Sequence, residues 1–289
     1  MTDASTGNLG IYITSKALYY AVSAKESEST GFLNKIGAFD FNVQMSTIFN
    51  DRLPDSVENL SRVIQNICSK YAIDSIRCLV QPGHECWSSL PKMVKDKEDE
   101  RESHIKILSS GKDRSQLQLY WFDISKPRFK FLVIRDRYVM NTYQNITEAG
   151  TETDFVSEFE MGSLWSKHAS IKGSFLTVSC TNSVLSIASF VLGKLRAATY
   201  IPFSNIWDLP YLWKLYSNHL PWLTGFHEQI YLYGEASEIV INNIKPYLDQ
   251  SAEIITMDSL KKCGIRSEEQ TFGFDLELAF PAMLLSLDI

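Results

Sequence analysis

The sequence predicts an α/β protein with two lobes and a small α/β insertion in the first lobe. The chain has 289 residues, which exceeds one ordinary domain and suits two packed lobes. A meander of three apolar strands opens the chain, and a second meander begins near residue 172. Alternating helices and strands follow each meander, so the architecture is repeated without a repeat of residues.

The first lobe is expected to contain three strands, a helix and a fourth strand. Its two opening strands lie within residues 9–22 and are joined by a turn at Thr14, Ser15 and Lys16. Asp55 and Ser56 can cap the helix, whose apolar residues recur at spacings of three and four. The remaining predicted strands of this lobe cover 37–43 and 75–80.

An α-β-β-α-β insertion is predicted next. Its first helix is strongly charged and places only Ile105 and Leu108 on one apolar face, which is typical of a solvated helix. An aromatic hairpin follows, and Asp136 can cap the second helix. The two hairpin strands are predicted at 116–124 and 128–134, and the closing strand at 153–156.

The second lobe repeats the plan after a connecting helix at 157–168. Ser204 can cap a helix that runs toward His219, and a closing apolar helix is expected from about Asp275. The predicted strands of this lobe are 175–180, 184–191, 195–201, 229–233 and 253–256. The predicted division is a first lobe at 1–90 plus 157–171, an inserted α/β subdomain at 91–156, and a second lobe at 172–289.

Composition excludes several classes of function. A net charge of −6, spread over the whole chain, disfavours binding to nucleic acid. No signal peptide or membrane-spanning stretch is recognised, so we expect a cytoplasmic protein. The five cysteines are scattered without a Cys-x-x-Cys pair, and His84, Glu85 and Cys86 would not all share one face of a strand, so no metal site is expected. Common hydrolase, P-loop and dinucleotide motifs are absent from the sequence.

Four segments carry a resemblance to a known family. Residues 10–22 are similar to a first phosphate loop that typically reads Gly-Ile-Asp-Ile-Gly-Ser-Ser-Ser-Ile-Lys-Ala-Val. Residues 136–156 resemble a helix that ends in Leu-x-x-Ala-Gly before a strand, and 230–237 resemble an adenosine loop, Leu-x-Gly-Gly-x-Ala. Residues 275–287 resemble a closing helix of small residues. In this order they resemble the actin-like ATPase superfamily, and within it the PilM family of type IV pilus assembly with its relatives GspL and FtsA.

This resemblance implies duplicated RNase H-like lobes around a nucleotide cleft. Family members place an acidic residue in each phosphate loop to hold hydrated Mg²⁺, and glycines that let backbone N–H groups approach the phosphates. Here Tyr12 and Ser179 stand at the acidic positions, and no Asp or Glu occurs at 9–24 or 171–200. We therefore expect a vestigial cleft without catalytic residues, metal or cofactor, formed by Tyr12, Thr14, Ser15, Lys16, Ser179, Thr181, Gly234 and Glu235.

The resemblance further implies a scaffold that binds the cytoplasmic segment of a membrane protein in a pilus or secretion assembly, at the inner face of the membrane. In PilM-like proteins a short partner peptide lies between the first lobe and the insertion. By position this indicates a partner groove with His84, Trp87, Tyr120, Phe122, Phe129 and Phe131. Aromatic residues in such an insertion more often form its core, and the aromatic residues at 207–222 are likewise more typical of a helix face that packs inward. Two alternatives stay open: a small-molecule kinase or phosphotransferase, and a regulator that binds ATP without hydrolysing it.

Overall fold

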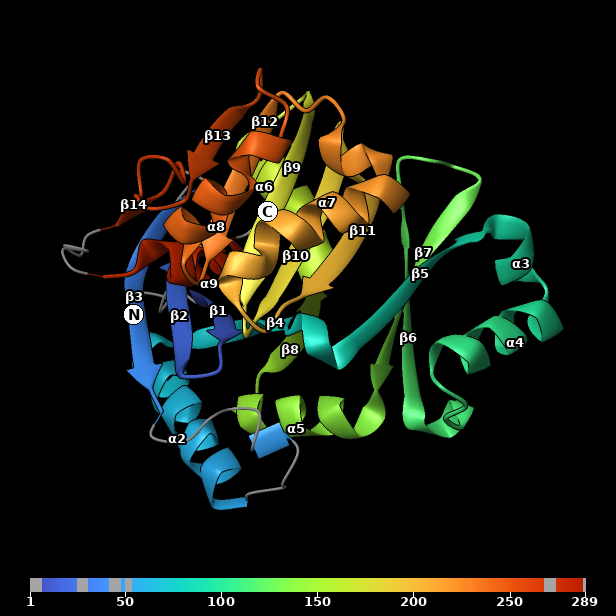
Figure 1. Ribbon diagram of the computed structural model, residues 1–289. Helices are drawn as coiled ribbons and strands as arrows, with labels where there is room; N and C mark the ends of the chain where they lie inside the picture. Colours follow the sequence, from blue (N-terminus) through green and yellow to red (C-terminus); the bar gives the residue numbers. More distant parts are fainter. Residues whose placement is uncertain (1–6, 25–30, 42–47, 50–53, 268–273, 288–289) are drawn as a thin grey trace.

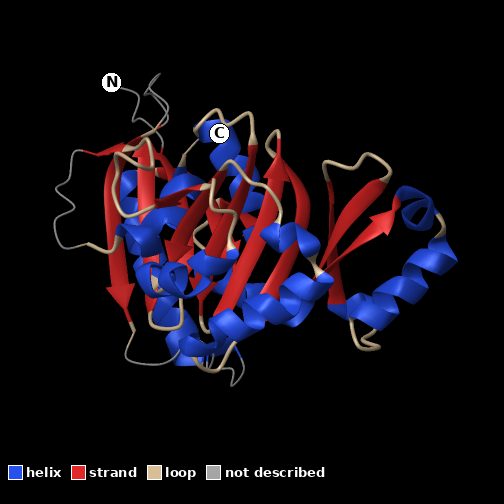
Figure 2. Ribbon diagram, turned by 45° about the horizontal axis from the view of Figure 1, so that its top comes forward, coloured by secondary structure: helices blue, strands red, loops and turns tan. Residues whose placement is uncertain are grey.

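The computed structural model describes residues 7–24, 31–41, 48–49, 54–267 and 274–287. Over these ranges the chain forms two large sheets, one smaller sheet, and helices on their faces (Figures 1 and 2). The first sheet has the order β14-β3-β2-β1-β4-β8. Its strands are β1 (Gly7–Ile13), β2 (Ala17–Ala24), β3 (Phe32–Asp40), β4 (Ile73–Val80), β8 (Glu152–Ser157) and β14 (Arg266–Ser267).

The second sheet has the order β11-β10-β9-β12-β13 and repeats the first in plan. In both sheets an antiparallel meander supplies one side and parallel strands extend the other, because helical crossovers return the chain to the same edge. Its strands are β9 (Ser174–Thr181), β10 (Val184–Val191), β11 (Lys194–Pro202), β12 (Gln229–Gly234) and β13 (Glu253–Thr256).

The large sheets and their helices form five layers. Helices α2 (Pro54–Tyr71) and α5 (Arg137–Thr147) cover the outer face of the first sheet, and α7 (Leu209–His219) and α8 (Ser237–Ile244) cover the outer face of the second. Helices α6 (Met161–His168) and α9 (Leu276–Ser286) lie between the sheets, within one shared hydrophobic core. The largest core of the protein is therefore the interface between the two halves.

Apart from Glu277 in its first turn and Ser286 at its end, helix α9 consists of apolar residues, as expected of a helix that is mostly buried. It packs on β1, β2 and β4 of the first sheet and on β12 of the second. At the closest approach, a Cβ atom on Gly10 of β1 would lie 1.9 Å from the Ala282 carbonyl oxygen. Glycine at this position thus lets the helix backbone lie directly on the strand.

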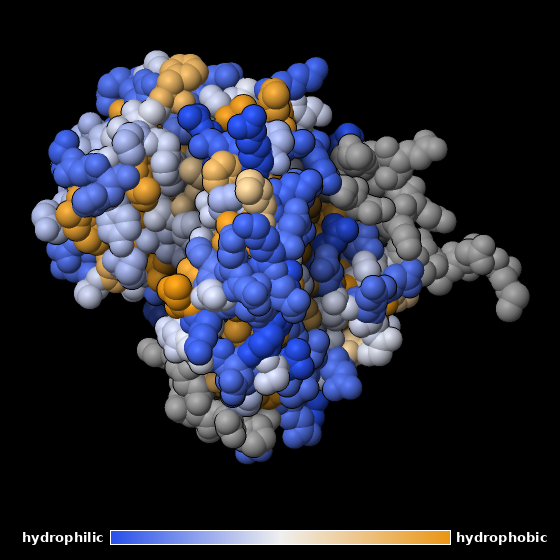
Figure 3. Space-filling view, turned by 90° about the vertical axis from the view of Figure 1, so that its right-hand side faces the viewer, coloured by the Kyte–Doolittle hydropathy of each residue, from blue (hydrophilic) through white to orange (hydrophobic). Residues whose placement is uncertain are grey.

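The small sheet has the order β5-β7-β6 and carries two helices on one face. Its elements are β5 (Glu85–Pro91), α3 (Lys92–Asp96), α4 (Glu98–Leu108), β6 (Leu117–Asp123) and β7 (Phe129–Asp136). Ile105 is buried against the sheet while most of α4 is exposed, and hydrophilic residues dominate the surface seen from this side (Figure 3). The predicted solvated helix and aromatic hairpin are both present.

A buried ion pair joins this insertion to the first lobe. Arg135 of β7 donates through Nε to Glu85 of β5 at 2.6 Å and through Nη1 to the Phe155 carbonyl oxygen of β8 at 2.9 Å. The Ser157 hydroxyl donates to the other oxygen of Glu85 at 2.7 Å. Both charged side chains are almost wholly removed from water. Each can therefore stay buried only because these hydrogen-bond partners satisfy it.

Strand pairing corrects the predicted division at three places. β5 lies before residue 91 yet belongs to the small sheet, and β8 lies before 157 yet pairs with β4 of the first sheet. β14 pairs with β3 although it falls within 172–289. These strands were assigned by their order along the chain, whereas a sheet is defined by pairing between distant segments.

Local boundaries also differ from the prediction. β3 begins at Phe32, and the predicted residues 42–43 lie outside the described ranges. Helix α2 begins at Pro54, so Asp55 lies in its first turn. Asn205 caps the helical turn before α7 in place of Ser204. His84 ends a 3₁₀ turn before β5 and is not in a strand, so the predicted strand geometry of 84–86 was wrong.

We predict that Gly10→Ala destabilises the protein by about 2 kcal/mol, because the methyl group forces α9 away from β1. Gly83→Ala is the matched control, since a Cβ there meets nothing within 4 Å. The measurement is the free energy of unfolding from urea denaturation of both variants. Equal stability of the two variants would contradict this close approach.

Candidate functional site

The loops of the predicted cleft meet between the two large sheets, and side chains fill the space between them. Tyr12 of β1 is 1% exposed, and its hydroxyl shares a hydrogen bond with the Thr181 hydroxyl at the end of β9. The two residues are 169 positions apart in the chain. A phenol ring and a hydroxyl therefore bridge the halves where the family resemblance expects metal and phosphate.

A buried carboxyl group makes the second bridge. Glu158 follows β8 and accepts hydrogen bonds from the Ser179 hydroxyl at 2.6 Å and from the Tyr233 hydroxyl at 2.7 Å. Ser179 is on β9 and Tyr233 on β12, so both donors come from the second sheet. The capping box formed by Ser157 and Glu160 fixes the turn that carries Glu158.

Burial controls the charge of this cluster. It raises the pKa of Glu158, although the bonds from Ser179 and Tyr233 oppose the rise. Burial also raises the pKa values of Tyr12 and Tyr233 well above their usual value, and the nearby Glu158 adds to both shifts. The bridge consequently consists of neutral phenols and hydroxyls around one carboxyl group.

A second carboxylate contacts the turn after β9. Glu235 directly follows β12 and accepts a hydrogen bond from the backbone N–H of Asn182 at 3.1 Å, so the protein itself satisfies an N–H group of the predicted second phosphate loop. Asn182 also donates through its amide to Gln81 at 3.1 Å, which links this turn to the end of β4. Gly234 is required because its φ is +95° and a Cβ would lie 2.4 Å from the Cys180 carbonyl oxygen.

The other predicted cleft residues serve the β1–β2 turn. The Thr14 hydroxyl donates to the Ala17 carbonyl oxygen and accepts from the Ala17 N–H, both at 3.1 Å. Ser15 is half-buried and Lys16 is exposed. Thr14 thus closes the turn internally, where a glycine loop would leave backbone N–H groups open to a phosphate.

A pocket of about 290 Å³ lies beside Gly234 and Ala236. Its lining includes the carboxylates of Asp258, Asp275 and Glu277. Three carboxylates in a small pocket repel a polyphosphate. Among the described residues, no group of three His, Cys, Asp or Glu side chains has a metal-binding arrangement.

The predicted partner residues divide into two environments. Phe131 stacks on Trp87 at 5.4 Å, and Trp87 meets Phe159 and Tyr200 edge-on at 5.1 and 5.9 Å. This face of the insertion is therefore packed against both lobes. The remaining predicted members lie as follows: Phe122 and Phe129 are half-buried in the same core, and Tyr120 is 37% exposed.

His84 belongs to a different cluster near α5. Its Nδ1 lies 3.0 Å from the Tyr143 hydroxyl, and its ring contacts Phe49 at 4.5 Å. Burial lowers the pKa of His84 to about 4, so the ring is neutral at neutral pH. His84 and the insertion aromatics do not form a single open groove.

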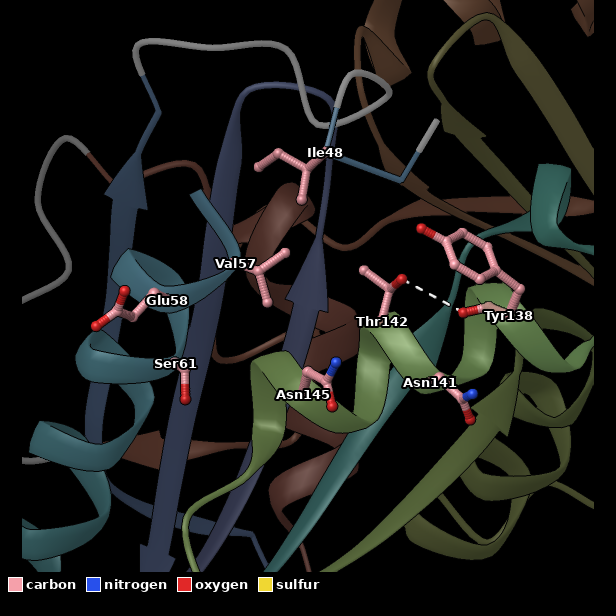
Figure 4. Close-up of a pocket in the computed structure, with 8 residues that line it drawn as sticks. All are labelled: Ile48, Val57, Glu58, Ser61, Tyr138, Asn141, Thr142 and Asn145. Atoms are coloured by element: carbon pink, nitrogen blue, oxygen red, sulfur yellow. Dashed lines mark hydrogen bonds between the residues drawn. The ribbon is translucent and has the colours of Figure 1, made fainter. Parts of the chain in front are cut away.

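An open pocket of about 560 Å³ lies between α2 and α5 (Figure 4). Val57 and Ile48 provide apolar surface, while Asn141 and Asn145 project from one side of α5. The full lining is Ile48, Val57, Glu58, Ser61, Tyr138, Asn141, Thr142 and Asn145. The sequence analysis did not identify this pocket, because its two walls come from helices that are distant in the chain.

Glu158 was not among the predicted site residues. It lies in the connection between the lobes, outside the two segments that resemble phosphate loops. The signal was available locally: an acidic residue inside a Ser-x-x-Glu capping box directly after an apolar strand. Only the pairing of β8 with β4 brings that turn to the interface.

No protein-family model and no curated protein matches the sequence. Solved structures do match, and they show that the chain has the actin-like ATPase fold. A PilM–PilN type IV pilus biogenesis complex matches at a TM-score of 0.65 and 11% identity, over 96% of this chain and 97% of the other. The cytoplasmic domain of EpsL, an inner membrane component of the Vibrio cholerae type II secretion system, matches at 0.52 and 9%, over 89% and 92%. A Bacteroides thetaiotaomicron protein with an actin-like ATPase fold matches at 0.51 and 12%, over 89% and 94%.

We predict that Glu158 makes stability depend on pH. Burial raises its pKa in the folded protein above the ordinary value of 4.5, so the folded state holds this proton to a higher pH than the unfolded chain. The contribution of Glu158 to the free energy of unfolding is complete below about pH 4.5, and it is lost as the pH rises through the pKa of the folded state.

In Glu158→Gln this contribution disappears, so the free energy of unfolding should fall less steeply with pH than in the wild type between about pH 5 and 8. The measurement is urea denaturation across that range. Glu148→Gln, at an exposed position, is the control and should leave the profile unchanged. Parallel profiles for Glu158→Gln and the wild type would show that the carboxyl group has the same pKa in both states.

Proposed function

We propose that this protein is a catalytically inactive, PilM-like scaffold that binds the cytoplasmic segment of a membrane protein in a pilus or secretion assembly. The observation that carries the proposal is the bridge between the lobes. Tyr12 with Thr181, and Glu158 with Ser179 and Tyr233, join the halves without a nucleotide. An actin-like ATPase needs carboxylates at the first and second loops to hold Mg²⁺, and this chain has Tyr12 and Ser179 there.

The similar structures support the choice of scaffold. One is a complex of PilM with PilN in pilus biogenesis, and another is the cytoplasmic domain of an inner membrane component. In the described part of this chain no helix is long and apolar enough to cross a membrane. A cytoplasmic protein held at the membrane by its partner fits these features.

The pocket between α2 and α5 is the partner site that we favour. The pocket is an open surface near His84, because His84 contacts Tyr143 and Tyr143 in turn contacts Phe49. The predicted aromatic face, by contrast, is packed against the lobes. Apolar side chains of a short peptide can contact Val57 and Ile48. The amides of Asn141 and Asn145 can bond the peptide backbone, since each offers donors and an acceptor.

A regulator that binds nucleotide without hydrolysis is the second candidate. The pocket beside Gly234 and Ala236 favours it, because the resemblance assigns this loop to adenosine. The acidic lining of the same pocket opposes it. A small-molecule kinase or phosphotransferase has less support, since Glu158 is enclosed by the hydroxyls of Ser179 and Tyr233.

ATP should leave the melting temperature unchanged with and without Mg²⁺, because the lobes are already bridged by side chains. A ligand at a hundred times its dissociation constant adds roughly 2.7 kcal/mol, which thermal denaturation detects easily. A shift with ATP alone would favour the regulator, and a shift that requires Mg²⁺ would refute the inactive scaffold.

Asn145→Arg should weaken binding of the cognate membrane-protein tail by roughly tenfold or more, since the long side chain fills the pocket. Asn218→Arg, at an exposed position of α7, is the matched control. Fluorescence anisotropy with labelled tail peptides from pilus and secretion assemblies measures both. Equal affinities for a tail that binds would remove the partner site from this pocket.

A further inference from the structure

The outer edge of β6 differs from the other sheet edges of the described chain. Natural proteins protect exposed edges with short strands, charges, proline, bulges or a covering segment. β14 and β13 are short, with 2 and 4 residues. β8 carries Glu152 and Asp154, and its Phe155 carbonyl oxygen is bonded by Arg135.

The sheet edges formed by β11 and β5 are also protected against pairing. β11 bears Lys194 and Arg196, contains a register shift in its pairing, and is met by the insertion where the Ser125 N–H bonds the Leu195 carbonyl oxygen. β5 ends in Pro91, which has no N–H group to offer a further strand, and leads directly into α3. By contrast, β6 runs for 7 residues as Leu-Gln-Leu-Tyr-Trp-Phe-Asp and pairs with β7 without a shift.

The backbone of β6 shows which groups face outward. The Leu117 N–H bonds the Arg114 carbonyl oxygen, and the Leu117 carbonyl oxygen accepts from Arg114 Nη1 at 3.2 Å. Both polar groups of Leu117 are thus used away from β7. Because orientation alternates along a strand, Leu119 and Trp121 also direct their backbone groups away from β7. No side chain of the described residues bonds them.

We propose that β6 is a homodimer interface, at which β6 of a second copy pairs with it in antiparallel orientation about a two-fold axis at Tyr120. In this register Leu119 of each copy lies opposite Trp121 of the other. An antiparallel hydrogen-bonded pair exchanges both N–H···O bonds, so the two pairs use all four outward groups of each strand. The small sheets then form one sheet across the dimer.

Side chains and charges support a second copy as the occupant. The axis places Asp123 of one copy opposite Leu117 of the other, where the Arg114 guanidinium lies against the Leu117 carbonyl oxygen. Asp123 pairs with Lys130 of its own chain and Arg114 Nε lies 3.9 Å from Glu102, yet 72% of the Asp123 side chain and 51% of the Arg114 side chain stay accessible to a second copy. Two symmetric Arg–Asp contacts result, and such self-complementarity is what a two-fold interface requires. In this register Tyr120 meets Tyr120 of the other copy across the axis, and Trp121 meets Leu119 as its cross-strand neighbour.

Sedimentation velocity over a range of concentrations tests the interface, with the full chain. The wild type should show a monomer–dimer equilibrium. Tyr120→Glu should raise the dissociation constant roughly tenfold or more, because two carboxylates then face each other across the axis. Tyr211→Glu, at an exposed tyrosine on α7, should leave it unchanged.

Charge exchange provides a test that misfolding does not mimic. Arg114→Glu and Asp123→Lys should each weaken the dimer, and the double variant should restore it. Hydrogen exchange should slow at the amides of Leu119 and Trp121 as dimer forms, while the Tyr120 amide, which faces β7, stays slow throughout.

Three results would overturn the proposal. These are a monomer at every concentration, a dimer in which the Leu119 and Trp121 amides exchange rapidly, or a double variant no better than the single ones. Protection of these amides in a monomer only after a tail peptide is added would assign the edge to that partner instead. Since the ATP and Asn145 experiments do not depend on dimerisation, the proposed function and this interface can fail separately.

Discussion

The closed arrangement of the two lobes depends on the hydrogen bonds that a buried carboxyl group requires. Glu158 leaves the first lobe at the end of β8, and its two hydrogen-bond donors, Ser179 and Tyr233, stand on separate strands of the second lobe. Separating the lobes would break both hydrogen bonds and return these groups to water, and a typical hydrogen bond inside a protein contributes about 0.5–1.5 kcal/mol net to stability. The closed arrangement is therefore held by the protein itself. In an actin-like ATPase, a nucleotide and its metal ion occupy this place between the lobes.

An apolar core between the two sheets packs behind this bridge and excludes water from it. Helix α9 is buried between the sheets from Ala279 to Ser286, and Gly10 lets it lie against β1 without a gap. The same core takes in α6 and the inner residues of both sheets, so the two halves share their largest hydrophobic cluster. A cleft that must open for nucleotide exchange would have to expose this surface. A core shared by the two halves is consistent with loop segments that contain no acidic residue.

A separate set of contacts holds the insertion against the two lobes. Arg135 and Glu85 form a buried ion pair at the start of the small sheet, and Ser157 and the Phe155 carbonyl oxygen complete their hydrogen bonding. Trp87 and Phe131 then pack on Phe159 and Tyr200. The aromatic residues expected to receive a partner thus fix the orientation of the insertion. The outer strand edge of the insertion and the pocket between α2 and α5 lie outside this packed aromatic face.

The sequence by itself determined the elements and the repeated plan, because apolar periodicity, turn residues and caps such as Asp136 act over a few positions. It also determined that no Asp or Glu occurs at 9–24 or 171–200, where the resemblance expects the acidic loop residues. Tertiary structure decided the rest. It moved β5, β8 and β14 to sheets that chain order does not indicate, brought Glu158 to the second lobe, and buried Trp87 and Phe131. Each of these depends on contacts between residues far apart in the chain, which local pattern does not encode.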